Sequence, residues 1–427
     1  MTEFLKLRTA EEAWEIFRAS FTPIVGMEPS PVIAALDRVL TQDATAPHDL
    51  PTFIRSTVDG YAVQAADTHG ASAGLPAYLD VVAEVPMGAR AAFVLEPGQA
   101  ALVHTGGNVP EGADAVVMLE YTHRAGEPLS ADTLTAQDGA WKPFALEVYR
   151  PLASGENCIQ IGEDVRAGEL VLPAGHTLRP QDIGGLLAVG ITEVSVARRP
   201  RVGIVSQGDE VVPPEQEPGP GQVRDINSYT LAGLVRRAGG IPLTYPIAPD
   251  QQEALDAAVK AAFDDAEIVV VTAGSSVSYR DLTAMAINKL GLPGVLVHGV
   301  AIRPGKPTIL AVCQGKPVFG LPGNPVSCIN IFQHFVTPTI RLLLGAPASP
   351  ICTVQAKLDR NIPAASGRAD FVRVRVERRD GETWAVPVFG KSNLIYTLIR
   401  SDGVIEVPLN SNGIPAGSTV TVTLDAR

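Results

Sequence analysis

Two proline–glycine turns with cationic neighbours are the first residues that could do chemistry. The turns PGKP at 304–307 and PGNP at 322–325 bracket two apolar runs that have the composition of strands. Proline fixes φ and lacks an amide donor while glycine permits positive φ, so such turns can present their remaining N–H groups to a ligand. Because Arg303 and Lys306 flank the first turn, the segment suits an anion, although an ordinary hairpin would use the same turn residues.

A second group of polar residues follows a series of predicted strands. From residue 201 onward, apolar strands at 202–206, 241–245 and 268–272 alternate with helices at 228–238, 251–263 and 281–290. This alternation predicts a doubly wound α/β domain, and such sheets bind ligands outside the carboxyl ends of their strands. The residues expected at or near that edge are Glu210, Asp250, Ser275, Ser276 and Asp281. Each of the three acids could instead serve only as a cap or a turn residue.

Composition excludes several other classes of protein. The net charge of −12 argues against a general nucleic-acid binder, so an anionic ligand would need a local cationic pocket. Neither a P-loop nor a G-x-G-x-x-G motif after a strand occurs, which argues against a common nucleoside triphosphatase. The four cysteines lack C-x-x-C spacing and the seven histidines form no metal-binding pair, so we expect buried free thiols and no zinc site.

The rest of the chain predicts β-rich and helical segments around the α/β domain. A Thr-x-x-Glu capping box opens a helix at 9–20, a second short helix is expected at 31–40, and a long helix at 326–344 is expected to be interrupted near Pro338. The expected N-cap is Asn227 or Ser228 for the helix at 228–238, and Asp250 for the helix at 251–263. Strands are expected at 78–85, 100–104, 115–121 and 145–149, and an all-β unit at 351–427.

Eight ordered motifs resemble one family. They are STVDGYAV, TGGNVPEGADAVVMLE, GEDVRAGELVLPAG, SQGDEV, GQVRDIN, the serine loop before Asp281, RPGKP and GLPGNPVS. The chain is thereby similar to the molybdopterin molybdenumtransferases, the MoeA and gephyrin E-domain family. The resemblance implies a multidomain α/β plus β fold with a central doubly wound domain like MogA and MoaB, an inserted β domain, an extended linker domain and a C-terminal small β-barrel. The expected boundaries are 1–50 with 151–200 for the linker domain, 51–150 for the inserted domain, 201–345 for the α/β domain and 350–427 for the barrel.

The resemblance also implies a reaction, a metal ion and partners. Family members insert molybdenum from molybdate into adenylylated molybdopterin and release AMP, with a divalent cation that is usually Mg²⁺. The chain is accordingly expected to be a cytoplasmic homodimer that binds neither nucleic acid nor membrane, with a MogA-like adenylyltransferase as a possible partner. A gephyrin-like scaffold that recruits a peptide, and hydrolysis of another nucleotide conjugate, are the alternatives.

Residue roles follow from the resemblance position by position. Glu210 and Asp281 are the expected Mg²⁺ ligands, and the dimer would bring the inserted domain of one subunit to the α/β domain of the other. The acids expected to act in catalysis are Asp59, Asp164, Glu210, Asp250 and Asp281. The residues expected to bind substrate are Thr105, Ser275, Ser276, Arg303, Pro304, Lys306, Gly323, Asn324, Arg373 and Ser392.

The chain departs from the family pattern at two places. Tyr279 stands where members commonly have a glycine, which restricts φ and adds bulk near a ligand. Gly299 and Arg303 stand where many bacterial members carry two lysines, and positions four apart on a strand share a face. The guanidinium of Arg303 can still clamp an oxyanion bidentately. Both departures concern the affinity for the oxyanion and the choice between molybdate and tungstate.

Overall fold

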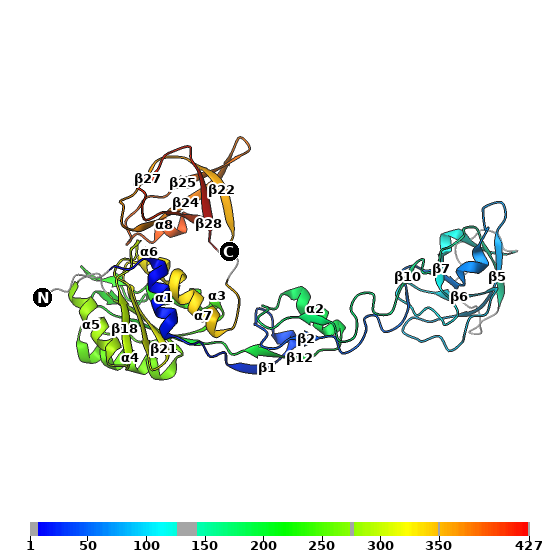
Figure 1. Ribbon diagram of the computed structural model, residues 1–427, viewed down its shortest axis with the longest axis horizontal. Helices are drawn as coiled ribbons and strands as arrows, with labels where there is room; N and C mark the ends of the chain where they lie inside the picture. The colour runs from blue at the N-terminus through cyan, green and yellow to red at the C-terminus, as the bar shows by residue number, and fades with distance from the viewer. Residues whose placement is uncertain (1–6, 126–142, 274–276, 349–350, 426–427) are drawn as a thin grey trace.

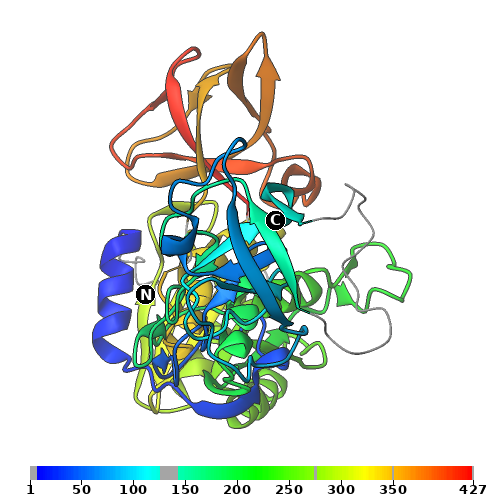
Figure 2. The same cartoon turned by 90° about the vertical axis from the view of Figure 1, so that its right-hand side faces the viewer.

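The computed structural model describes residues 7–125, 143–273, 277–348 and 351–425, with side chains described outside 273–281. The molecule is elongated (Figure 1). An α/β domain lies at one end, a slender segment leads away from it, and a β-rich domain lies at the far end. Viewed along the long axis, the C-terminal barrel stands above the α/β domain (Figure 2).

A mixed sheet forms the centre of the α/β domain. Its order is β16 (Ile241–Thr244), β13 (Arg201–Ser206), β17 (Ile268–Ala273), β21 (Lys316–Pro322), β20 (Ile309–Cys313) and β18 (Pro293–His298). The first four strands pair in parallel, whereas β20 pairs antiparallel with both β21 and β18. The strands expected at 202–206, 241–245 and 268–272 are therefore confirmed.

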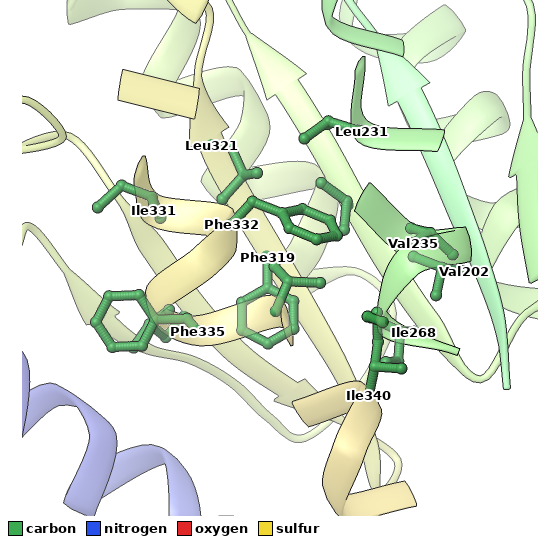
Figure 3. Close-up of a cluster of buried hydrophobic side chains, with 14 of the residues drawn as sticks. Val202, Leu231, Val235, Ile268, Phe319, Leu321, Ile331, Phe332, Phe335 and Ile340 are labelled. Carbon is green, nitrogen blue, oxygen red and sulfur yellow. The ribbon is translucent and has the colours of Figure 1, made fainter. Parts of the chain in front are cut away.

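Helices cover both faces of this sheet. Residues on alternate strand positions enter two separate cores, because successive side chains of a strand point to opposite faces. One core contains Val202, Ile268 and Phe319 under α3 (Asn227–Ala238), α6 (Pro325–Ile331) and α7 (Thr337–Leu343) (Figure 3). The other lies under α4 (Gln252–Asp265) and α5 (Val277–Asn288).

The N-terminal helix belongs to the α/β domain rather than to the linker domain. Thr9 and Glu12 form the expected capping box at the start of α1 (Ala10–Ser20). Ala13 and Phe17 are completely buried in the same core as Phe319. The ring centroids of Phe17 and Phe319 lie 5.4 Å apart. The assignment of residues 1–50 to the linker is thus wrong for α1, because its apolar face packs on the sheet.

Two expected N-caps are also wrong. Neither Asn227 nor Ser228 caps α3; instead the carboxylate of Asp225 accepts a hydrogen bond from the Ser228 amide at 3.0 Å. Helix α4 has no side-chain cap, because Asp250 turns its carboxylate toward a neighbouring loop.

The interruption near Pro338 is present as a π-helical turn at Phe332–Val336 between α6 and α7.

The linker domain is built from short antiparallel pairs. Strand β1 (Met27–Pro31) pairs with β12 (Glu193–Ala197), and β2 (Ala44–Thr45) pairs with β11 (Leu170–Leu172) beside α2 (Pro180–Ala188). The helix expected at 31–40 is limited to one 3₁₀ turn at Val32–Ala34. Asp37 has φ of 61°, a left-handed conformation that ends helical geometry.

The inserted domain is a mixed β-sheet. Its order is β7 (Ala115–Met118), β4 (Gly60–Val63), β6 (Gln99–Val103), β5 (Ala77–Glu84), β9 (Phe144–Val148) and β8 (Thr122–Arg124). All the strands expected in this region are present. Gly60 lies inside the sheet, where a Cβ atom would meet the Val117 carbonyl oxygen at 1.9 Å. Close approach of the neighbouring strand therefore requires a glycine at this position.

The C-terminal strands close into a barrel that continues into the α/β domain. The order is β24 (Ala369–Arg379), β25 (Glu382–Pro387), β22 (Thr353–Leu358), β28 (Thr419–Leu424) and β26 (Gly403–Val407), and β26 pairs back to β24. Strand β19 (Ile302–Arg303) of the α/β domain adds in parallel to β24. The barrel is thereby fixed beside the PGKP turn. Across the described residues, no helix is long and apolar enough to span a membrane.

Candidate functional site

Strand direction explains why both proline–glycine turns lie at one edge of the sheet. Strand β21 ends at the PGNP turn, beside the carboxyl ends of the parallel strands β13 and β17. Strand β20 runs the other way, with Ile309 opposite Gly320, so its starting residues lie at that same edge. The PGKP turn that precedes β20 therefore meets the PGNP turn in space.

Specific contacts hold the PGKP turn. Gly305 has φ of 137°, and a Cβ atom there would meet Ile331 Cδ1 at 2.5 Å. The Pro304 carbonyl accepts a hydrogen bond from Asn330 Nδ2 at 2.8 Å, and the Thr308 hydroxyl donates to the Gly305 carbonyl at 2.6 Å. The turn is thus fixed from α6 and from its own strand.

The PGNP turn joins the α/β domain to the barrel. Asn227 Nδ2 donates to the Gly323 carbonyl at 2.7 Å, and Asn324 Nδ2 donates to Ser392 Oγ at 3.0 Å. The Val326 amide donates to the Ser392 carbonyl at 3.1 Å. Gly323, Asn324 and Ser392 are therefore brought together at one place.

A pocket of about 840 Å³ lies between these turns and the barrel. Its lining includes Pro304 and five cationic residues, which are Arg303, Lys306, Arg368, Arg373 and Lys391. Two of them are engaged: Arg303 Nη1 lies 3.1 Å from Asp370 Oδ2, and Arg373 forms an ion pair with Asp425. A concave surface with this excess of positive charge suits an anionic ligand.

Acidic residues occupy the neighbouring part of the sheet edge. The carboxylate of Asp250 accepts hydrogen bonds from Gln207 Nε2 and from the Asp209 amide, both at 3.1 Å. The Asp250 amide in turn donates to Asp209 Oδ1 at 3.0 Å. Buried Gln207 also accepts a hydrogen bond from the Thr283 hydroxyl of α5 at 3.5 Å. Asp250 therefore fixes the loop that carries Glu210.

Glu210 lies directly over a glycine. Gly208 has φ of 145°, and a Cβ atom there would come within 2.5 Å of Glu210 Oε2. The Glu210 carboxylate forms no ion pair or hydrogen bond with the part of the chain whose side chains are described. A half-buried carboxylate in this state can serve as a ligand for a hard cation.

A second pocket of about 570 Å³ lies beside this acidic loop. Asp209 and Asp225 line it together with Tyr229 and Tyr245, and its lining includes no cationic residue of the described chain. Burial, with a hydrogen bond to Asp265, raises the pKa of Tyr245 to about 12. The phenol therefore stays neutral at neutral pH and donates its hydrogen bond to Asp265.

Asp59 and Thr105 meet in the inserted domain. Asp59 Oδ1 accepts a hydrogen bond from the Thr105 amide at 2.8 Å and lies 3.8 Å from His104 Nδ1. The other ring nitrogen of His104 lies 3.0 Å from Glu84 Oε1. Asp164 is exposed in a turn where the inserted and linker domains meet. Within one chain the inserted domain lies at the end opposite to the α/β domain, with the linker domain between them (Figure 1).

Four of the residues singled out in the sequence lie between Ser275 and Asp281. Ser275 and Ser276 lie outside the described residues, and Asp281 and Tyr279 lie on α5 with their side chains outside the description. Gly299 lies between β18 and β19 with φ of 108°. The idea that residues 299 and 303 share a strand face is therefore wrong, and a lysine at 299 would be strained in this conformation.

The cysteines are free thiols. Cys313 and Cys328 are buried, as expected, and burial raises the pKa of both. Cys328 therefore stays protonated although it follows the PGNP turn. Cys352 is exposed, so the expectation of burial is wrong there, because its position just before β22 leaves it outside the barrel core.

Sequence reasoning missed three residues of the site. Gln207 supports the acidic loop, Asp370 pairs with Arg303, and Arg368 lines the cationic pocket. The position of Gln207 directly after a buried strand was a usable signal. The other two are brought to the site by the pairing of β19 with β24, which no local pattern predicts.

Known proteins resemble this chain along nearly its whole length. The family model for the MoeA N-terminal region (domain I and II) matches residues 8–190, that for a probable molybdopterin binding domain matches 203–342, and that for the MoeA C-terminal region (domain IV) matches 355–424. The molybdopterin molybdenumtransferase of Bacillus subtilis is 34% identical over 392 residues, which cover 91% of this chain and 88% of that protein. The Nostoc enzyme of the same name is 37% identical over 395 residues, covering 91% and 86%.

A solved structure agrees with this assignment. The crystal structure of a molybdopterin biosynthesis MoeA protein from Pyrococcus horikosii superposes with a TM-score of 0.82 at 36% identity, covering 98% of this chain and 99% of that one. Fold, pocket and matches together define a protein of molybdenum cofactor biosynthesis. The chain belongs to the MoeA family of molybdopterin molybdenumtransferases.

Proposed function

We propose that this protein inserts molybdenum into adenylylated molybdopterin and releases AMP. The observation that carries the proposal is the position of the cationic pocket beside the acidic edge of one sheet. Molybdate and the phosphate of the substrate are both anions. Their oxygens would be bound by the PGKP and PGNP turns and by the barrel loop that carries Lys391 and Ser392. The acidic loop would face the phosphoanhydride that is cleaved.

Mg²⁺ fits the donor set at this edge. Glu210 follows β13 and Asp281 follows β17, and these strands are neighbours, so both residues belong to one end of the sheet. No cluster of three potential metal ligands occurs among the described side chains. Mg²⁺ often takes only one or two carboxylates and keeps several waters. When bound, the ion would offset the charge of the phosphoanhydride.

Gly208→Ala should weaken this metal site. The added methyl group would displace the Glu210 carboxylate, so the Mg²⁺ concentration for half-maximal AMP release is expected to rise about tenfold. Gly417→Ala is the matched control, because Gly417 also has positive φ but no atom within 4 Å of the added Cβ. Equal Mg²⁺ dependence in both variants would contradict the role of Glu210.

A homodimer would complete the site. Asp59 and Thr105 belong to the inserted domain and Asp164 to its junction with the linker, whereas Glu210 belongs to the α/β domain at the other end of the molecule (Figure 1). A second copy running in the opposite direction would bring the two ends together. The linker domain offers apolar side chains for such contact: Ile24 is 82% exposed and Ile33 is 78% exposed. Exposed large apolar residues gathered on one segment are typical of an interface.

The reaction is tested with purified protein, adenylylated molybdopterin, Mg²⁺ and molybdate. AMP release together with an active cofactor, detected by reconstitution of a molybdenum enzyme, is the expected result. AMP release without dependence on molybdopterin would instead support hydrolysis of another nucleotide conjugate. Absence of turnover together with specific capture of a peptide partner would support the scaffold alternative.

Subunit mixing tests the shared site. Asp59→Ala and Asp250→Ala homodimers are each expected to be nearly inactive. After exchange of subunits, half of the dimers would be mixed and would hold one intact site, so about a quarter of the wild-type rate should return. Native mass spectrometry with one variant carrying a mass tag measures the fraction of mixed dimers. No recovery in a sample that contains mixed dimers would contradict a site shared between subunits.

A further inference from the structure

A histidine of the inserted domain lies between two carboxylates. His104 directly follows β6, and its Nε2 atom lies 3.0 Å from Glu84 Oε1 at the end of β5. Its Nδ1 atom lies 3.8 Å from Oδ1 of Asp59, the residue before β4. Neither carboxylate forms an ion pair with a lysine or arginine among the side chains that the structure describes. His104 is therefore placed to compensate both negative charges.

The backbone around His104 is fixed. The Gly107 amide donates to the His104 carbonyl at 2.8 Å, and a Cβ atom at Gly107 would meet that same oxygen at 2.8 Å. The Gly106 amide donates to the Ser56 carbonyl at 2.7 Å, so the loop is joined to the segment that precedes Asp59. A side chain on a loop held in this way can hold a neighbouring group in a defined position.

Glu84 orients the imidazole ring. Parallel pairing places Glu84 opposite Leu102, two residues before His104, so the ends of β5 and β6 lie side by side. The side chains of Glu84 and His104 are 30% and 33% exposed, whereas that of Asp59 is 58% exposed. A carboxylate that accepts the N–H of one ring nitrogen fixes the plane of the ring and the direction of the other nitrogen. Nδ1 is thereby turned toward Asp59, which stays open to a ligand.

The number of protons on the ring decides what Nδ1 can do for Asp59. A neutral imidazole has one N–H, and donating it to Glu84 leaves Nδ1 as an acceptor that faces a carboxylate. An imidazolium has an N–H on each nitrogen, so the same ring can donate to Glu84 and attract Asp59. A further charged group at this loop is Arg55, whose Nε donates to the Gly106 carbonyl at 3.4 Å.

We propose that His104, oriented by Glu84 and in its protonated form, positions the Asp59 carboxylate for the reaction. The inference rests on the proposed function, in which Asp59 acts in a site shared between two subunits. Asp59 Oδ1 already accepts a hydrogen bond from the Thr105 amide at 2.8 Å, so the imidazolium constrains the carboxylate from a second side. A carboxylate held through one oxygen keeps its other oxygen for the substrate. His104 is thus a positioning residue that acts through Asp59.

Two variants of similar shape test this role in the full-length protein. Leucine and asparagine side chains are close in size, but only asparagine can donate a hydrogen bond. His104→Leu is expected to lower kcat for AMP release about tenfold with KM changed by less than about twofold, and His104→Asn should stay within about threefold of the wild-type kcat. Equal kcat values for the two variants, or a His104→Leu kcat within about twofold of wild type, would overturn the proposal.

Controls separate this effect from a loss of folding. Thermal melting of both variants checks that the inserted domain remains folded. His69→Leu is the matched control, because His69 is an exposed histidine of the same domain outside this cluster, and it should keep the wild-type kcat. The advantage of wild type over His104→Leu should shrink as the pH is raised through the range in which histidine loses its proton. An advantage that does not change with pH would overturn the role of the protonated form.

A double-mutant cycle tests whether His104 acts through Asp59. In an Asp59→Asn background, His104→Leu is expected to change the residual rate by less than about twofold, because the group that it positions is already altered. A loss of about tenfold in that background as well would show an effect independent of Asp59 and would overturn the proposal. A wild-type protein that releases no AMP would overturn the proposed function itself, whereas an active wild type with an unaffected His104→Leu variant overturns only the role of His104.

Discussion

Asp250→Ala should lower the rate of AMP release roughly 100-fold while the protein stays folded. The Asp250 carboxylate accepts hydrogen bonds from Gln207 Nε2 and the Asp209 amide, so its loss frees the loop that carries Glu210. Misplacing a catalytic group by about 1 Å is enough for a loss of this size. Single-turnover measurement of AMP release at saturating substrate gives the rate.

Matched variants separate this effect from a general loss of charge. Asp264→Ala removes an exposed carboxylate of the same domain that pairs only with Lys260 among the described residues, and it should keep the wild-type rate. Asp250→Asn keeps the size of the side chain but places an amide donor against one of its two donor neighbours, so we expect it to recover only part of the activity. An Asp250→Ala rate within threefold of wild type would show that the loop is held by other contacts.

Phe319→Ala should destabilise the α/β domain by about 3–5 kcal/mol. Phe319 is completely buried at the centre of the core, where α1, α3 and the helices after β21 meet (Figure 3). Its ring centroid lies 5.4 Å from that of Phe17, and the Phe17 ring stacks on Trp14 at 5.6 Å. Deleting the ring leaves a cavity between the sheet and these helices, which cannot close without moving them.

Trp14 provides the measurement. In a background with Trp141→Phe and Trp384→Phe, Trp14 is the remaining tryptophan of the sequence, so its fluorescence in urea follows this domain. Domain-specific detection is needed because a chain of several domains does not unfold in one step. The control Phe53→Ala, at a ring 40% exposed in another part of the molecule, should change this transition by less than about 0.5 kcal/mol. A change below about 1 kcal/mol in Phe319→Ala would contradict the central role of the ring.

Local sequence patterns predict the elements of this protein well. The capping box of Thr9 and Glu12, the buried strand 268–272 and the break before Pro338 each depend on residues close together in the chain. Errors arise where a local signal competes with a distant one. Asp250 has the sequence of a helix cap, but the loop after β13 offers its carboxylate two donors.

The two stiff turns and the acids that follow the strands were determined by the sequence itself, because proline and glycine restrict their own backbone and strand direction places each loop at an edge. Tertiary structure alone decided which of the cations are paired with acids. Arg303 and Arg373 look like the natural oxyanion ligands in the sequence, yet β19–β24 pairing and barrel closure set each beside a carboxylate. Charge depends on neighbours in space, and those neighbours lie 67 and 52 residues away along the chain.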